Sequence, residues 1–292
     1  MKSRNPRLSR RDFLKMSGIF TLAGVVTGAT GFGYMSEVEP GWLDVTQLSL
    51  KLPRLGKAFA GFRLVQFSDI HFGTWITTER MQKVIELILA QQPDVVAITG
   101  DFMHGYSWSA DHPRLLTELA DALRPLTKAC LTVGVLGNHD YWTRASEVRT
   151  MLADVGVVEL NNAVHTLQRG SYLLHLTGVD DVWEEYDRLE DVLAQLPKNG
   201  AAILLAHEPD FADESATAGR FDLQISGHSH GGQLVLPFIG PPITPYLARK
   251  YPLGLYHIGE MLLYTNRGIG MEDVFIRLNC RPEITVFSFF PQ

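Results

Sequence analysis

Aspartate, asparagine and histidine residues recur at the ends of five apolar segments of this 292-residue chain. The segments are QFSDIH, AITGDF, VLGNHD, LLAHEPD and ISGHSHGG, in that order between residues 66 and 232. Taken singly, each also fits a turn residue, a helix cap or a buried histidine. Together they offer enough oxygen and nitrogen donors for two first-row metal ions. The candidate residues are Asp69, His71, Asp101, Asn138, His139, Asp140, His207, His228 and His230.

The last of these segments surrounds two histidines with glycines. Gly227 precedes His228, and Gly231 and Gly232 follow His230. Because glycine adopts backbone dihedrals that a side chain forbids, we expect a tight loop that directs both imidazoles at one point. A polar surface turn is the alternative that this segment alone leaves open.

The elements that position these residues follow a βαβ rhythm from about residue 62. Apolar runs predict strands at 62–68, 94–99, 130–136, 172–179 and 201–206, and helical patterns lie between them at 78–91, 111–123, 145–155 and 187–196. Strand-like pieces follow as LQIS, QLVL, MLLYTN and EITVFSFF. This order indicates an α/β fold with helix-covered strands. Sites in open α/β sheets form beyond the carboxyl ends of the strands, so the five segments should converge.

Composition limits the function classes. A chain that is 46% hydrophobic can bury a large core, and its length fits one or two domains. Residues 1–15 contain six basic residues and one acidic residue, a local charge of +5. Because the net charge of the whole chain is −6, the remaining residues carry a net charge of −11. An acidic body argues against nucleic-acid binding. Cys130 and Cys280 are too few for a disulfide framework or a cysteine zinc site, although a single bridge stays open.

The N-terminus has the pattern of an export signal. SRRDFLK, residues 9–15, resembles a twin-arginine signal and is followed by an uncharged run from residue 16 to 35. We therefore expect the twin-arginine translocase as a partner during export, and a location in the periplasm or on the outer face of the cytoplasmic membrane. Twenty uncharged residues can just cross a bilayer, so a cleaved signal and a retained anchor both stay open. The predicted organisation is a signal or anchor at 1–35, a connector at 36–61 with one short strand, and a domain at 62–292.

The order D-x-H, G-D, G-N-H-D, H and G-H-x-H resembles the calcineurin-like metallophosphoesterases, and AHEPD, TNRGIG and RLNCRPEI resemble their twin-arginine-exported branch. The resemblance implies a four-layer αββα sandwich around two divalent metal ions, which are manganese, iron or zinc with manganese favoured. It implies that Asp101 bridges the two metals. The other ligands would be Asp69, His71 and His230 for one metal, and Asn138, His207 and His228 for the other. It also implies that His139 protonates the leaving oxygen while Asp140 orients its ring.

The resemblance implies a phosphodiesterase, and the export signal adds the expectation of a cell-envelope substrate. Two cations about 3.5 Å apart can share a hydroxide, lower its pKa for attack, and stabilise the charge that develops on the phosphoryl oxygens. One alternative is a pyrophosphatase for a nucleotide-linked lipid precursor of the UDP-2,3-diacylglucosamine type. The other is a non-catalytic, metal-stabilised binding module, which would need neither His139 nor Asp140. The loop at 237–259 could shape a substrate groove, touch a membrane surface or simply pack.

Overall fold

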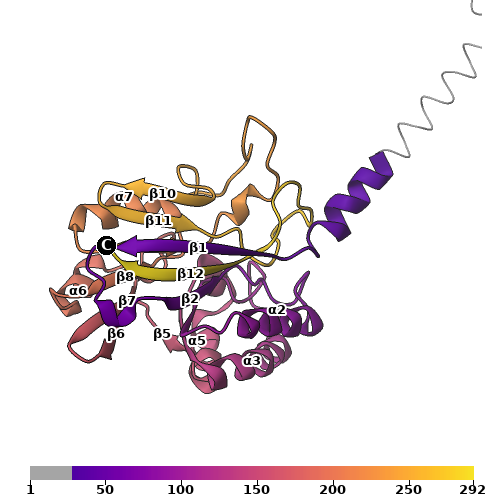
Figure 1. Ribbon diagram of the computed structural model, residues 1–292. Coiled ribbons are helices and arrows are strands. Elements are labelled where there is room, and N and C mark those ends of the chain that lie inside the picture. Colours follow the sequence, from indigo (N-terminus) through magenta and orange to yellow (C-terminus); the bar gives the residue numbers. More distant parts are fainter. Residues whose placement is uncertain (1–27) are drawn as a thin grey trace, which may run out of the picture.

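The computed structural model describes residues 28–292, which form two six-stranded sheets flanked by helices (Figure 1). Sheet 1 has the order β1 (Asp44–Leu52), β12 (Glu283–Pro291), β2 (Phe62–Phe67), β3 (Val95–Thr99), β4 (Leu131–Val135) and β5 (Val158–Glu159). Sheet 2 has the order β10 (Gly254–Ile258), β11 (Met261–Thr265), β9 (Leu223–Ser226), β8 (Ala201–Leu205), β7 (Tyr172–Gly178) and β6 (Ala163–Arg169). The helices are α2 (Thr78–Ala90), α3 (His112–Ala129), α4 (Asn138–Thr143), α5 (Ala145–Val155), α6 (Leu189–Gln195) and α7 (Ala212–Ser215).

The two sheets pack face to face and each carries helices on its outer face. Leu64 and Phe287 of sheet 1 meet Ile203 and Ile225 of sheet 2 in one buried cluster between the sheets. A second cluster joins sheet 1 to α2, α3 and α5, and a third joins sheet 2 to α6 and α7. The layers therefore run helix, sheet, sheet, helix, which confirms the predicted αββα sandwich.

The apolar spacing of the sequence explains the outer layer. In α2 the buried residues Met81, Val84, Ile85 and Ile88 recur at helical intervals, and the Thr77 hydroxyl caps the first turn by accepting from the backbone N–H of Arg80 at 3.4 Å. Helix α3 continues past the predicted end at residue 123 because its buried face continues to Leu126 across an internal proline.

The strands that precede the candidate residues lie side by side. β2, β3 and β4 pair in parallel in sheet 1, and β7, β8 and β9 pair in parallel in sheet 2. The strand expected at QLVL is wrong, since residues 233–236 form only isolated bridges from Leu234 to Leu278 and from Leu236 to Gly240. The edge strands β6 and β10 pair antiparallel and contain no fully buried residue, so they lack the apolar run that marks a buried strand.

The stretch treated above as a connector supplies the edge of sheet 1. β1 pairs in parallel with β12 from Asp44 to Leu52, and Leu52 and Phe59 are fully buried between the sheets. Residues 44–61 therefore pack as part of the same body as the domain predicted at 62–292, because Leu50 and Leu52 of β1 enter the core between the sheets.

The predicted signal lies mostly outside the described residues, which begin at residue 28. Residues 28–33 are α-helical and a π-helical turn, η1 (Tyr34–Val38), continues them. Within residues 28–292 there is no helix of the length and apolarity that crossing a membrane requires. Cys130 and Cys280 are both free, so the bridge left open by the sequence is not formed.

Candidate metal centre

The five polar segments meet at the carboxyl ends of strands from both sheets. Asp69 and His71 follow β2, Asp101 follows β3, and α4 begins directly after β4. From sheet 2, His207 follows β8 and His228 follows β9. All nine predicted site residues are buried, with no residue more than 3% exposed. The predicted convergence is confirmed.

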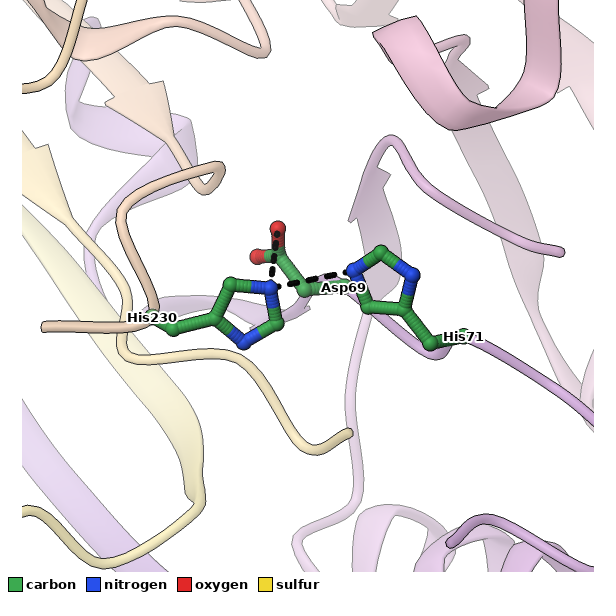
Figure 2. A group of neighbouring side chains, drawn as sticks. All are labelled: Asp69, His71 and His230. Atoms are coloured by element: carbon green, nitrogen blue, oxygen red, sulfur yellow. Dashed lines mark hydrogen bonds and ion pairs between the residues drawn. The ribbon is translucent and has the colours of Figure 1, made fainter. Parts of the chain in front are cut away.

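One group of donors consists of Asp69, His71 and His230 (Figure 2). The Nε2 atoms of His71 and His230 face each other at 3.0 Å, and Nε2 of His230 lies 3.7 Å from Oδ1 of Asp69. All three ligand atoms fall within 4.8 Å of one another. Two imidazole nitrogens and a carboxylate at this spacing can share a single divalent cation.

A second group consists of Asp101, His207 and His228, again with ligand atoms within 4.8 Å of one another. Oδ2 of Asp101 lies 3.2 Å from Nε2 of His207 and 3.5 Å from Nε2 of His71. One carboxylate oxygen therefore lies between the two groups, where a bridging ligand is needed.

Hydrogen bonds from the back of each ring fix which nitrogen is available. His207 donates from Nδ1 to the Thr99 carbonyl at 2.6 Å, and His228 donates from Nε2 to the Tyr246 carbonyl at 2.8 Å. These bonds direct Nε2 of His207 and Nδ1 of His228 at the site, as metal ligation requires. Burial lowers the pKa of His207, but the charge of Asp101 outweighs burial and raises that pKa well above its ordinary value, so a metal would displace a proton from Nε2 of His207. Burial also lowers the pKa of His71, His228 and His230, so these imidazoles favour the neutral, ligating form.

The carboxylates are held in the same way, through one oxygen each. Asp69 Oδ1 accepts from the backbone N–H of His228 at 2.8 Å, and Asp101 Oδ1 accepts from the backbone N–H of His139 at 3.0 Å. Burial raises the pKa of Asp101, but the positive charges of His207 and His139 outweigh it and hold that pKa well below its ordinary value. Asp101 is therefore ionised at neutral pH.

Several buried polar atoms at the centre have no hydrogen-bond partner, although buried groups in proteins are normally paired. The unpaired atoms are Asp69 Oδ2, His71 Nδ1, Asn138 Oδ1 and Nδ2, His207 Nε2 and His230 Nδ1. Leaving the Asp69 oxygen, the Asn138 amide and Nε2 of His207 unpaired in one buried place costs free energy that bound cations would remove. The Nδ1 atoms of His71 and His230 lie across each ring from the Nε2 atoms that face the site, so cations there would not pair with them. The residues present thus fit divalent metal ions.

The backbone at the donors is strained. Five donors adopt left-handed φ angles, although none is glycine: Asp69 at 52°, His71 at 46°, Asp101 at 56°, His228 at 65° and His230 at 49°. Each such residue costs about 1–3 kcal/mol and persists only where the surroundings fix it, which is typical of functional sites. The chain accepts this strain in order to direct several side chains at one place.

The glycines of the GHSHGG segment allow the backbone to turn, and Gly227 also allows it to pass close to neighbouring side chains. A Cβ on Gly227 would collide with Ser68 Oγ and Asp69 Oδ2, so only glycine lets this loop pack against the β2 end. Gly231 and Gly232 have φ angles of 60° and 73°, which confirms the tight loop predicted from the sequence.

His139 lies beside the donors, and both its ring nitrogens face acceptors. Nδ1 donates to the Gly105 carbonyl at 3.0 Å, and Nε2 donates to Glu272 Oε1 at 2.7 Å. Burial lowers the pKa of His139, but the charges of Asp101 and Glu272 outweigh burial and raise the pKa to about 9. The ring is therefore held as a proton donor. Glu272 was not predicted, because it lies in a loop without a recognisable motif.

The expectation that Asp140 orients the ring of His139 is wrong. The Asp140 carboxylate accepts from the backbone N–H groups of Gly137 at 3.0 Å, Phe102 at 2.9 Å and Met103 at 3.1 Å. Adjacent residues on a helix point in different directions, so Asp140 in α4 faces away from its neighbour's ring. Asp140 instead ties the start of α4 to the loop that follows Asp101.

A cavity of about 510 Å³ opens beside the donors. Its floor includes Asn138, His228 and His230. One wall is aromatic. The ring of Trp142 stacks on that of Tyr106 with 5.5 Å between the ring centroids, and it meets the ring of Trp183 edge-on with 5.4 Å between the centroids. Four aliphatic side chains also line the cavity and are called the aliphatic wall: Leu234, Ile243, Val274 and Ile276. This size suits a small-molecule group, with apolar walls and polar donors at one end.

Donor sets of this kind, gathered at strand ends and open to a cavity, are those with which metal-dependent hydrolases act on phosphate esters. The chain belongs to the calcineurin-like phosphoesterase family, whose model matches residues 62–232. It is therefore a metallophosphoesterase, a hydrolase of phosphoesters.

Two bacterial relatives match almost the whole chain. The metallophosphoesterase YkuE of Bacillus subtilis (strain 168) is 35% identical over 286 residues, which cover 97% of this chain and 98% of YkuE. The phosphodiesterase YaeI of Escherichia coli (strain K12) is 30% identical over 285 residues, which cover 96% of this chain and 99% of YaeI. A transmembrane protein with metallophosphoesterase domain from Danio rerio is 29% identical over 284 residues, covering 90% of this chain and 61% of that protein.

Proposed function

We propose that the protein hydrolyses phosphodiester bonds of a cell-envelope substrate with two divalent cations. The single observation that carries this proposal is the position of Asp101, whose Oδ2 atom lies between Nε2 of His71 and Nε2 of His207 at 3.5 and 3.2 Å. When bound, two cations supply a nucleophile at neutral pH and stabilise charge on the phosphoryl oxygens. The name of the relative YaeI, a phosphodiesterase, supports this ester class.

In this proposal the seven donors divide into two sets that share Asp101. Asp69, His71 and His230 complete one set, which the 4.8 Å grouping of their ligand atoms supports. The other set is completed by three residues: Asn138, His207 and His228. The unpaired amide oxygen of Asn138 supports its inclusion, because a buried amide without a partner is otherwise costly.

His139 is proposed to protonate the leaving oxygen. Its Nε2–H is directed at the Glu272 carboxylate, an anionic acceptor like a phosphodiester oxygen. Its Nδ1–H is fixed by the Gly105 carbonyl, so the ring keeps one orientation while the Nε2 proton moves. A positioned imidazole of this kind contributes about 10²- to 10⁴-fold to a rate.

Manganese is the proposed metal, with iron and zinc as the alternatives that a mixed oxygen and nitrogen donor set also accepts. The test is to strip the purified protein with a chelator and to add back each metal separately. We expect hydrolysis of bis(p-nitrophenyl) phosphate to disappear and to return best with manganese, at two equivalents per chain. Undiminished activity in the stripped protein would exclude the metal mechanism.

We also propose that the twin-arginine translocase exports the chain and that its body lies outside the cytoplasmic membrane. The paired Arg10 and Arg11 and the uncharged residues 16–35 support this location. Replacing both arginines with lysine should leave the protein in the cytoplasm, whereas the unchanged chain should fractionate with the envelope. The mass of the mature N-terminus would distinguish a cleaved signal from a retained anchor.

A further inference from the structure

Two adjacent loops beside the cavity expose large apolar side chains. In the first loop Phe238 is fully exposed at 109%, Ile239 is 75% exposed and Ile243 is 78% exposed. In the second loop Val274 is 58% exposed and Phe275 is 41% exposed. We call these five side chains the apolar rim. Single exposed apolar residues are common on proteins, whereas a group on neighbouring loops marks an interaction surface.

Hydrogen bonds join the two loops into one structure. The side-chain amide of Gln233 donates to the carbonyls of Glu272 and Val274, both at 3.0 Å, and the backbone N–H of Val235 donates to the Leu278 carbonyl at 2.9 Å. The rim is therefore presented by a fixed scaffold and not by two independent loops.

The backbone at Phe238 adds a second argument. Residues 236–239 form a turn closed by the Ile239 N–H to the Leu236 carbonyl at 3.2 Å, with Pro237 and then Phe238 at φ 66° in its centre. The second central position of such a turn favours glycine or asparagine, so an aromatic residue there is strained. Since Phe238 is fully exposed, no packing within the protein offsets this strain. A contact between this side chain and an apolar surface outside the protein would offset the strain.

The rim is continuous with the cavity that leads to the metal centre. Ile243 and Val274 belong to both, and together with Leu234 and Ile276 they form the aliphatic wall. The residues that line the cavity include no lysine or arginine. A path of this kind suits a substrate with an apolar chain attached to its phosphate better than a polyanion.

The N-terminal helix is held next to the segment that follows the second loop. The backbone N–H of Arg277 donates to the Met35 carbonyl at 2.9 Å, and beyond the end of the helix the guanidinium of Arg281 lies 3.5 Å from the ring centroid of Trp42. Figure 1 shows this helix leaving the body at the end of the molecule where the orange loop ahead of β10 projects. Residues 1–27 precede the described part, and the uncharged run from 16 to 35 leads into this helix. An anchor formed by that run would bring the rim to a membrane.

We propose that the apolar rim inserts into a lipid bilayer and that the substrate is a membrane amphiphile. Its phosphodiester would enter the metal centre while its acyl chain contacts the aliphatic wall and the rim. This inference rests on the proposed phosphodiesterase function, which it deepens by naming the substrate class.

The first test compares two substrates that release the same chromophore from the full, manganese-loaded chain. One is bis(p-nitrophenyl) phosphate in solution, and the other is dioleoyl phosphatidyl-p-nitrophenol in phosphatidylcholine vesicles. The double variant Phe238→Ser, Ile239→Ser should lower kcat/KM on the vesicles about tenfold or more and leave the soluble reaction within twofold, because each buried apolar side chain contributes to insertion. Leu87→Ser on α2, at a side chain 39% exposed, is the matched control and should change neither rate.

Equal rates for the double variant and the unchanged chain on vesicles would overturn the inference, and so would an equal loss on both substrates. A second measurement does not depend on catalysis. Phe238→Trp and Leu87→Trp are compared in vesicles of brominated phosphatidylcholine, and only the tryptophan at 238 should add quenched fluorescence. The same quenching in both variants would reject insertion. Inactivity on bis(p-nitrophenyl) phosphate would instead reject the proposed function, so the two failures are distinguishable.

Discussion

The Nε2 atom of His139 lies 2.7 Å from Oε1 of Glu272, although 133 positions separate the two residues in the sequence. The contact joins the helix that follows β4 to the loop that follows β11, and Glu272 also lines the cavity. Tyr106 also donates to Glu272 Oε1 at 3.0 Å, so this carboxylate has two partners. Glu272 thus holds a proton donor in place and belongs functionally to the site.

Replacing Glu272 should separate its hydrogen bond from its charge. Glu272→Gln keeps an oxygen acceptor for His139 Nε2, so we expect kcat on bis(p-nitrophenyl) phosphate to stay within about threefold. Glu272→Ala removes the acceptor and frees the ring, which should lower kcat about tenfold, a fraction of what a positioned acid contributes. Steady-state kinetics on both variants check this. An identical loss in the two variants would show that the acceptor is irrelevant.

Replacing His139 should damage turnover and spare the metals. His139 contacts Glu272 and Gly105 through its ring and is not among the proposed ligands, although its ligand atom also lies within 4.8 Å of those of His71 and Glu272. We expect His139→Asn to lower kcat about 10²- to 10⁴-fold while the chain still binds as much manganese as the unchanged protein. Metal analysis beside single-turnover kinetics measures both quantities. A variant that loses its metals would assign His139 to the ligand set.

Gly227→Ala should disturb the centre through sterics alone. The new Cβ would meet Ser68 Oγ and Asp69 Oδ2, and neither can retreat easily because Ser68 and Asp69 are buried. Overpacking of this kind costs about 1–3 kcal/mol of the free energy of unfolding. We expect a lower melting temperature and a lower manganese content. Gly33→Ala is the control, since a Cβ there meets nothing within 4 Å and both properties should persist.

The buried pair Asp181 and Glu208 should make stability depend on pH. Burial, followed by the charge of Glu208, raises the pKa of Asp181 to about 10, far above an unfolded value of about 3.9. The folded chain then binds a proton that the unfolded chain lacks. The contribution of Asp181 to the free energy of unfolding is fully present below the pKa of the unfolded state. It declines as the pH rises toward the pKa of the folded state.

Asp181→Asn removes the group that takes up this proton. The asparagine keeps a side-chain oxygen that can accept the hydrogen bond from the backbone N–H of Glu184, which is 2.8 Å long with Asp181. We expect the free energy of unfolding of the variant to rise relative to that of the unchanged chain by up to about 1.4 kcal/mol for each pH unit between pH 5 and pH 8. Urea denaturation at several pH values supplies the comparison. Parallel pH curves for the two proteins would refute a raised pKa at Asp181.

The sequence predicted the donors because their chemistry is concentrated at strand ends. Asp69, Asp101 and His207 each follow a buried apolar run, and parallel strands bring such ends together. The same rule cannot find Glu272, whose position depends on Gln233, which accepts from its backbone N–H at 2.9 Å. That contact is set by tertiary packing and leaves no periodic trace in the sequence.

Other differences have similar causes. The role given to Asp140 followed from its place beside His139, but a helix directs neighbours apart, and its partners are backbone groups of Phe102, Met103 and Gly137. The aromatic wall of the cavity was also missed, since Trp142 and Trp183 come from segments that no short-range pattern connects. Contacts between distant loops were thus the part that the sequence could not predict.

The central claim is that Asp101 bridges two cations, and an anomalous difference map from crystals grown with manganese tests it most directly. We predict two peaks about 3.5–4 Å apart. One should be next to Asp69, His71 and His230, and the other next to His207 and His228, with the Asp101 carboxylate contacting both. A single peak, or two peaks that share no carboxylate, would contradict the account.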